Sequence, residues 1–60
     1  MTDQATRDWL AGYACALATI MRAHDEGVAV RDAMGCVGGY DALVKAGADE
    51  YDLEALEPLR

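Results

Sequence analysis

The sequence predicts an all-α fold: a small helical bundle of one long N-terminal helix and about three short helices. Proline occurs only at position 58, and β-branched residues are sparse apart from the stretch Val28 to Val30. Both residue classes disfavour helices, so their scarcity makes helix the economical prediction throughout the chain. Residues 1–60 are expected to form a single helical domain, of a size that buries only about 60 % of the surface its unfolded chain exposes.

The long helix is predicted from Asp3 to His24. At about 100° per residue its larger side chains fall on one face of the helix. These are Trp9, Leu10, Tyr13, Leu17, Ile20, Met21 and His24. Thr2 or Asp3 is the expected N-cap. Gly27 is expected to end the helix, because glycine adopts positive φ readily.

Small residues line the long helix beside this apolar face. They are Ala5, Gly12, Ala16, Thr19 and Ala23. Gly12 costs up to about 1 kcal/mol relative to alanine inside a helix, and the close approach of another backbone would compensate for that cost. These two faces support an alternative function, a small self-associating structural or regulatory protein that forms a homodimer.

Three shorter helices are predicted in the remainder of the chain. Their apolar residues are Val28, Val30, Ala33, Met34 and Val37 in the first, Tyr40, Leu43, Val44 and Ala46 in the second, and Leu53 and Leu56 in the third. The first is expected to close at Gly38–Gly39 and the second at Gly47. Asp49 is the expected N-cap of the third, with Asp52 at the capping-box position, and Pro58 is expected to end it.

The segment from Val30 to Ala46 has the length and turn chemistry of a helix-turn-helix. A DNA-reading helix needs basic and amide side chains, whereas the second helix here offers Asp41 and Lys45. A plain helical hairpin packed on the long helix is therefore predicted. With a formal charge of −6 the chain opposes direct nucleic-acid binding, which leaves a helix-turn-helix DNA binder as the weaker alternative.

The sequence contains no motif for catalysis, metal binding or cofactor binding. It has one histidine, no Ser-His-Asp set and no glycine-rich phosphate loop. His24 and the acids beside it, even with Cys15 and Cys36, lack the paired spacing of zinc ligands. The acidic run near the C-terminus lacks the glycine and the final acid of a calcium loop. We expect a protein that is not an enzyme, without metal or cofactor, and with His24 partly buried near the end of the long helix.

Cysteine usage and hydropathy predict a cytoplasmic protein. No signal sequence opens the chain, and its longest apolar run is too short to cross a bilayer. Cys15 and Cys36 are accordingly expected to be free thiols. A single disulfide between them is the alternative.

The most distinctive feature of the sequence is a cluster of carboxylates near the C-terminus. No positively charged residue lies between Asp49 and Pro58. On one short helix the carboxylates would fall within roughly 12–14 Å, a charge density comparable to a nucleic-acid strand. Such a surface would repel DNA and attract proteins built to hold DNA, although solubility alone is the simpler explanation. The predicted partner-binding residues are Asp41, Asp49, Glu50, Asp52, Glu54 and Glu57.

Three stretches, WLAGYACAL, VRDAMGCVGG and LVKAGADEYDLEALEPL, resemble small acidic open reading frames of bacteriophages and prophages. Some phage proteins of this size and charge are anti-CRISPR or other anti-defence inhibitors, which bind a host effector and block its nucleic-acid groove by imitating DNA charge. The resemblance implies a non-catalytic inhibitor in the bacterial cytoplasm. Its partner would be a protein with a basic nucleic-acid-binding groove, such as a CRISPR effector. The resemblance transfers no site residue.

Overall fold

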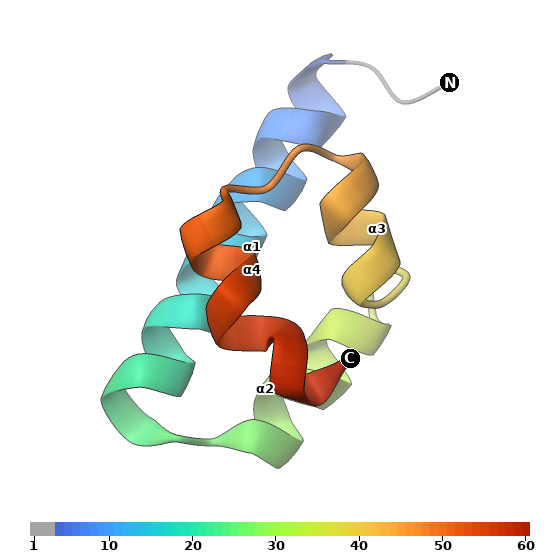
Figure 1. The fold of residues 1–60 in the computed structure, drawn as a ribbon. Helices are drawn as coiled ribbons and strands as arrows, with labels where there is room; N and C mark the ends of the chain where they lie inside the picture. Colours follow the sequence, from blue (N-terminus) through green and yellow to red (C-terminus); the bar gives the residue numbers. More distant parts are fainter. Residues whose placement is uncertain (1–3) are drawn as a thin grey trace.

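The longest element of the computed structural model, which describes residues 4–60, is helix α1. The elements in order are α1 (Gln4–His24), α2 (Gly27–Gly35), α3 (Tyr40–Lys45), α4 (Glu50–Leu56) and a 3₁₀ turn, η1 (Glu57–Leu59) (Figure 1). The molecule measures 32 × 19 × 14 Å, and its long dimension matches the length of about 31 Å expected for α1. The predicted all-α fold of one long and several short helices is confirmed, and residues 4–60 contain no strand.

The end of α1 differs from the prediction. The helix stops at His24, and the residue that adopts positive φ is Asp25, at 52°, whereas Gly27 begins α2. Asp25 still donates its backbone N–H to the carbonyl of Met21 at 3.0 Å. A short polar side chain tolerates the left-handed conformation, so no glycine is needed there. The predicted N-cap, Thr2 or Asp3, lies outside the described residues.

The residues predicted to close the short helices have the expected conformations, although α2 itself already ends at Gly35, before Gly38–Gly39. Gly38, Gly39 and Gly47 have φ values of 103°, 84° and 83°, in the region that side chains with a Cβ rarely adopt. At the start of α4 a side-chain oxygen of Asp49 accepts the backbone N–H of Tyr51 at 2.8 Å, which is the expected N-cap bond. The α-helical hydrogen bonding then stops before Pro58, which lies in η1.

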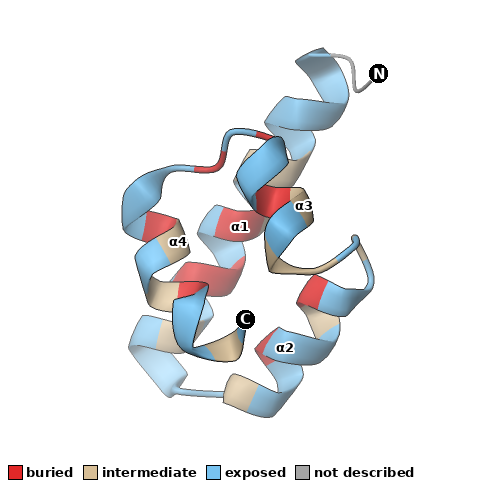
Figure 2. Ribbon diagram, turned by 45° about the vertical axis from the view of Figure 1, so that its right-hand side comes forward, coloured by how far each residue is buried: buried red, intermediate tan, exposed pale blue. Residues whose placement is uncertain are grey.

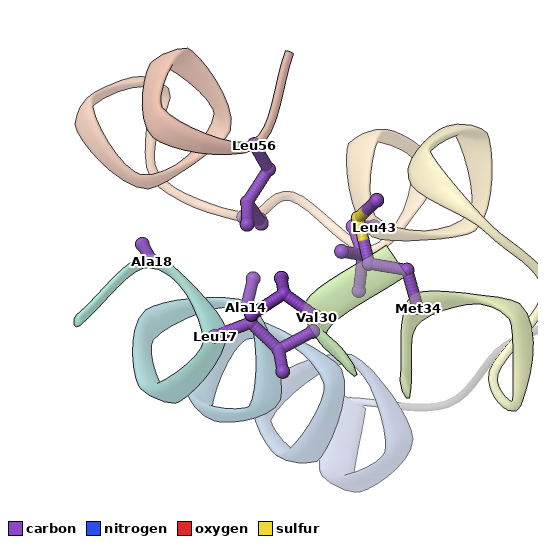
Figure 3. Packing of buried hydrophobic residues seen from close by; sticks show 8 residues of the cluster. Ala14, Leu17, Ala18, Val30, Met34, Leu43 and Leu56 are labelled. Carbon is purple, nitrogen blue, oxygen red and sulfur yellow. The ribbon is translucent and has the colours of Figure 1, made fainter. Parts of the chain in front are cut away.

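The core forms between α1 and the three short helices (Figure 2). Its buried cluster comprises Ala14, Leu17, Ala18, Val30, Met34, Leu43, Ala48 and Leu56. Figure 3 shows Leu56 pointing from the C-terminal segment toward α1, while Met34 and Leu43 meet beside Val30. Each short helix thus contributes one or two side chains to one cluster, and none has a core of its own.

The predicted apolar face of α1 is only partly the face that packs. Leu17 is buried, and Leu10, Tyr13 and Met21 pack at the edge of the core. By contrast, Trp9 and Ile20 are 60 % and 38 % exposed, and His24, which we expected to be partly buried, is exposed. The buried positions at the centre are instead Ala14, Leu17 and Ala18.

The buried face of α1 is rotated from the predicted apolar face because neighbouring helices pack closest where α1 has small side chains. Small side chains let two helices lie close together, so α2 and α4 close on the alanine edge of α1. A prediction of buried positions from side-chain hydrophobicity favours tryptophan and isoleucine over alanine.

The same kind of prediction is wrong for Val28 and Val44. Both were predicted to face the core, and they are 81 % and 46 % exposed.

Gly12 is an exposed helix position with open space around it. A Cβ added there would meet nothing within 4 Å, so the close backbone approach expected at Gly12 does not occur within the described chain. Gly12→Ala is expected to raise the free energy of unfolding by up to about 1 kcal/mol, because alanine loses less backbone entropy in a helix. Urea denaturation of dilute protein measures this change.

Gly47→Ala is the matched control for this prediction. Gly47 has φ 83°, so the same added methyl group is expected to destabilise the chain by about 1 kcal/mol or more. If Gly12→Ala were also destabilising, Gly12 would have a packing role that residues 4–60 do not show.

Candidate protein-binding site

Helix α4 is stabilised locally by its acidic start. Asp49 caps the helix, and Glu50 and Asp52 lie in its first turn, where negative charge is favoured by the helix dipole. Leu56 is buried and Leu53 packs against the core, which fixes the side of the helix that faces inward. The remaining side of α4 is turned to solvent.

Three carboxylates share that solvent side. Glu50, Glu54 and Glu57 are all exposed, and their spacing of four and then three residues places them on one stripe about 10 Å long. We call these three residues the acidic stripe. It contains half of the six predicted partner-binding residues.

Asp52 does not belong to this surface. It is 9 % exposed, because two residues after Glu50 the helix has turned by about 200°. One of its carboxylate oxygens, Oδ1, lies 3.7 Å from Nη1 of Arg22. The prediction that Asp52 presents its charge to a partner is therefore corrected: this carboxylate joins α4 to α1.

Arg22 makes three contacts with α4. Besides the ion pair with Asp52, its guanidinium lies 3.6 Å from the centroid of the Tyr51 ring, and Nη2 donates to the backbone carbonyl of Tyr51. An arginine over an aromatic ring is a favourable cation–π pair. A positive charge therefore reaches α4 from the last turn of α1.

No local rule could have found this contact, since 29 residues separate Arg22 from Tyr51. Spacing rules describe pairs three or four residues apart on one helix. The only hint in the sequence is the absence of any cation within the acidic segment itself. That absence leaves a buried carboxylate to find its partner elsewhere in the chain.

The other predicted residues are more dispersed. Asp41 is exposed in the first turn of α3, on a different helix from the acidic stripe. Asp49 is exposed as well, but one of its oxygens is held by the N-cap bond. The structure therefore concentrates the free negative charge of α4 and η1 at Glu50, Glu54 and Glu57.

A shallow hollow of about 250 Å³ lies beside the stripe, between α1 and α4. It is lined by Met21, Arg22, Tyr51, Glu54 and Ala55. An aromatic ring, a guanidinium and a carboxylate meet there, and the hollow is wide open to solvent. Small-molecule sites bury most of their ligand in a concave, mainly apolar pocket, so this region is better suited to contact with a macromolecule.

The described part of the chain contains no candidate metal site, no disulfide and no helix that could span a membrane. Residues 4–60 include no group of three or more histidine, cysteine or acidic side chains placed to hold a metal ion. Cys15 and Cys36 are free, as predicted, and both are exposed. No helix between Gln4 and Arg60 is long and apolar enough to cross a membrane.

No protein-family model matches this chain, and no match was found among curated proteins or solved structures.

Proposed function

We propose that this chain is a non-catalytic inhibitor of the phage anti-defence type, which uses the acidic stripe to occupy a basic nucleic-acid-binding groove on a host protein. A CRISPR effector is the partner to test first. The observation that carries the proposal is the stripe itself: three exposed carboxylates within about 10 Å on one side of α4 and η1.

No ion pair among residues 4–60 involves the acidic stripe. Among residues 4–60 the one ion pair is that of Arg22 with Asp52, on the inward side of α4. Glu50, Glu54 and Glu57 take no part in it, and like charges this close on one helix cost local stability. Lysine and arginine side chains of a DNA-holding groove would remove that repulsion.

Charge reversal at two positions of the stripe tests the proposal. We expect Glu50→Lys/Glu54→Lys to abolish inhibition and capture of the effector, because attraction becomes repulsion at the contact. The matched control is Glu26→Lys/Asp32→Lys. Both acids are exposed; Glu26 is the N-cap residue of α2, and Asp32 lies within that helix. Each double variant raises the formal charge by four, from −6 to −2, so only the location of the charge differs.

The measurement is effector capture by the tagged chain at low and high salt, with circular dichroism to verify that both variants keep their helices. Capture of a CRISPR effector that is lost at high salt, and lost in the stripe variant but not in the control, supports the proposal. Salt screens such contacts over about 8–10 Å. Equal capture by both variants would sink the assignment to the stripe.

A further inference from the structure

Helix α1 has a second uncharged face, on the side away from the core. Six residues follow a spacing of four, three, four, three and four: Ala5, Trp9, Gly12, Ala16, Thr19 and Ala23. All six are exposed, and at 100° per residue they lie opposite the buried Ala14. We call them the α1 seam. An alternating spacing of three and four is the repeat by which one helix packs along another.

The residues of the α1 seam can be buried in an interface at little cost. Trp9 is 60 % exposed, and its ring is held against Tyr13 at 5.2 Å between centroids, so a large aromatic side chain is already oriented. The hydroxyl of Thr19 donates to the carbonyl of Cys15 at 2.9 Å. Covering Thr19 would therefore leave no unpaired hydroxyl, which removes the usual penalty for burying one.

The first part of α1 lies outside the buried core that residues 4–60 form. Every residue from Gln4 to Trp9 is exposed, and Figures 1 and 2 show this end of the helix projecting beyond the other elements. Isolated helical turns are marginal in water, and helices in proteins depend mostly on packing for their stability. A partner lying along α1 would supply that packing.

We propose that the partner is a second copy of this chain, whose α1 packs antiparallel along the seam. In that orientation the seam is complementary to itself. Trp9 of one copy faces Thr19 of the other, and Gly12 faces Ala16, so each larger residue meets a smaller one. A parallel pair would instead bring the two Trp9 rings to the same level.

Charge also favours the antiparallel pair. Asp8 and Arg22 flank the seam on the same side, near opposite ends of α1. The antiparallel register places Asp8 of each copy opposite Arg22 of the other, at the flanking positions that set orientation in coiled coils. The side chain of Arg22 remains 34 % exposed although it pairs with Asp52.

A third consequence of the register concerns Cys15. It is exposed and flanks the middle of the seam on the same side as Asp8. In the antiparallel pair the two copies of Cys15 face each other across the two-fold axis. In a parallel pair they would lie on opposite sides of the two helices.

The test is sedimentation of the full chain over a range of concentrations. We expect a reversible dimer, weakened at least about tenfold by Ala16→Glu, because this change places a charge in the centre of the seam. Ala29→Glu, at an exposed alanine of α2, is the matched control and should leave the dimer unchanged. A chain that stays monomeric at all concentrations, or equal effects of the two variants, would overturn the proposal.

Cross-linking with a short bismaleimide tests the orientation. Cys36→Ser is expected to retain a cross-linked dimer and Cys15→Ser to lose it, because only Cys15 meets its own copy. Cross-linking that depends on Cys36 would refute the antiparallel register even if a dimer forms. The seam and the acidic stripe share no residue, so a failed dimer test leaves the inhibitor proposal to its own experiment.

Discussion

Leu17→Asp is expected to unfold the domain at 25 °C. Leu17 is 6 % exposed and belongs to the buried cluster. Removing its side chain alone costs about 2–5 kcal/mol, and burial of an unpaired carboxylate adds to that loss. A chain of 60 residues has a total stability of about 3–9 kcal/mol, so this single change consumes most or all of it.

Ile20→Asp is the matched control, three residues further along the same helix. The sequence pattern puts Leu17 and Ile20 on one face, but Ile20 is 38 % exposed. We expect a loss of less than about 1 kcal/mol there, because an aspartate at Ile20 can keep its charge in water. Circular dichroism and urea denaturation of dilute protein distinguish the two variants. Equal losses would mean that the buried face of α1 is the one the pattern predicts.

Arg22→Met is expected to destabilise the chain by about 1–3 kcal/mol. The substitution keeps much of the aliphatic bulk but removes the guanidinium from Asp52, whose side chain is 13 % exposed. A buried polar group left without its partner costs about that much, and more if it is charged. The change also removes the cation from the face of the Tyr51 ring. Thermal or urea unfolding provides the measurement.

A double variant distinguishes the effect of losing the ion pair between Arg22 and Asp52 from the effect of losing either side chain. In the double variant Arg22→Met/Asp52→Leu no charge is left unpaired, so we expect it to be more stable than Arg22→Met alone. The opposite outcome is a double variant that loses as much free energy of unfolding as Arg22→Met and Asp52→Leu lose together. In that case the ion pair would contribute nothing to the contact between α1 and α4, and apolar packing alone would stabilise that contact.

The two proposed surfaces are compatible in one assembly. The seam lies on the side of α1 away from the core, whereas the acidic stripe lies on α4 and η1, which pack on the core side. Self-association along α1 therefore does not use the residues of the acidic stripe. A dimer would present two acidic stripes to a partner, which raises the effective concentration of the second once the first has bound.

Much of the fold was predictable from local signals. Three glycines, a capping aspartate and a single proline mark the ends of the short helices. Glycine adopts the positive φ that a helix end needs, aspartate accepts from a free backbone N–H, and proline cannot continue the helical hydrogen bonds. The end of α1 was predicted less well, since Asp25 takes the positive φ that Gly27 was expected to provide. Asparagine and aspartate share this ability with glycine, and sequence alone does not say which residue will use it.

The candidate site was predictable in charge but not in geometry. The sequence shows the acidic residues and the missing cation, and the helical spacing of Glu50, Glu54 and Glu57 already places those three on one side. It does not show that Asp52 turns inward to a guanidinium from another helix. Of the six predicted partner-binding residues, Asp52 is the one that is buried instead of turned to solvent.

The sequence by itself determined that this protein is helical, where its short helices end, and that its C-terminal third is acidic, because these properties depend on residues close together in the chain. Only the tertiary structure decided which face of α1 is buried and that Arg22 pairs with Asp52. Both depend on where α2 and α4 settle against α1. That position is governed by how closely two backbones can approach at alanines, a contact between distant residues that no local pattern records.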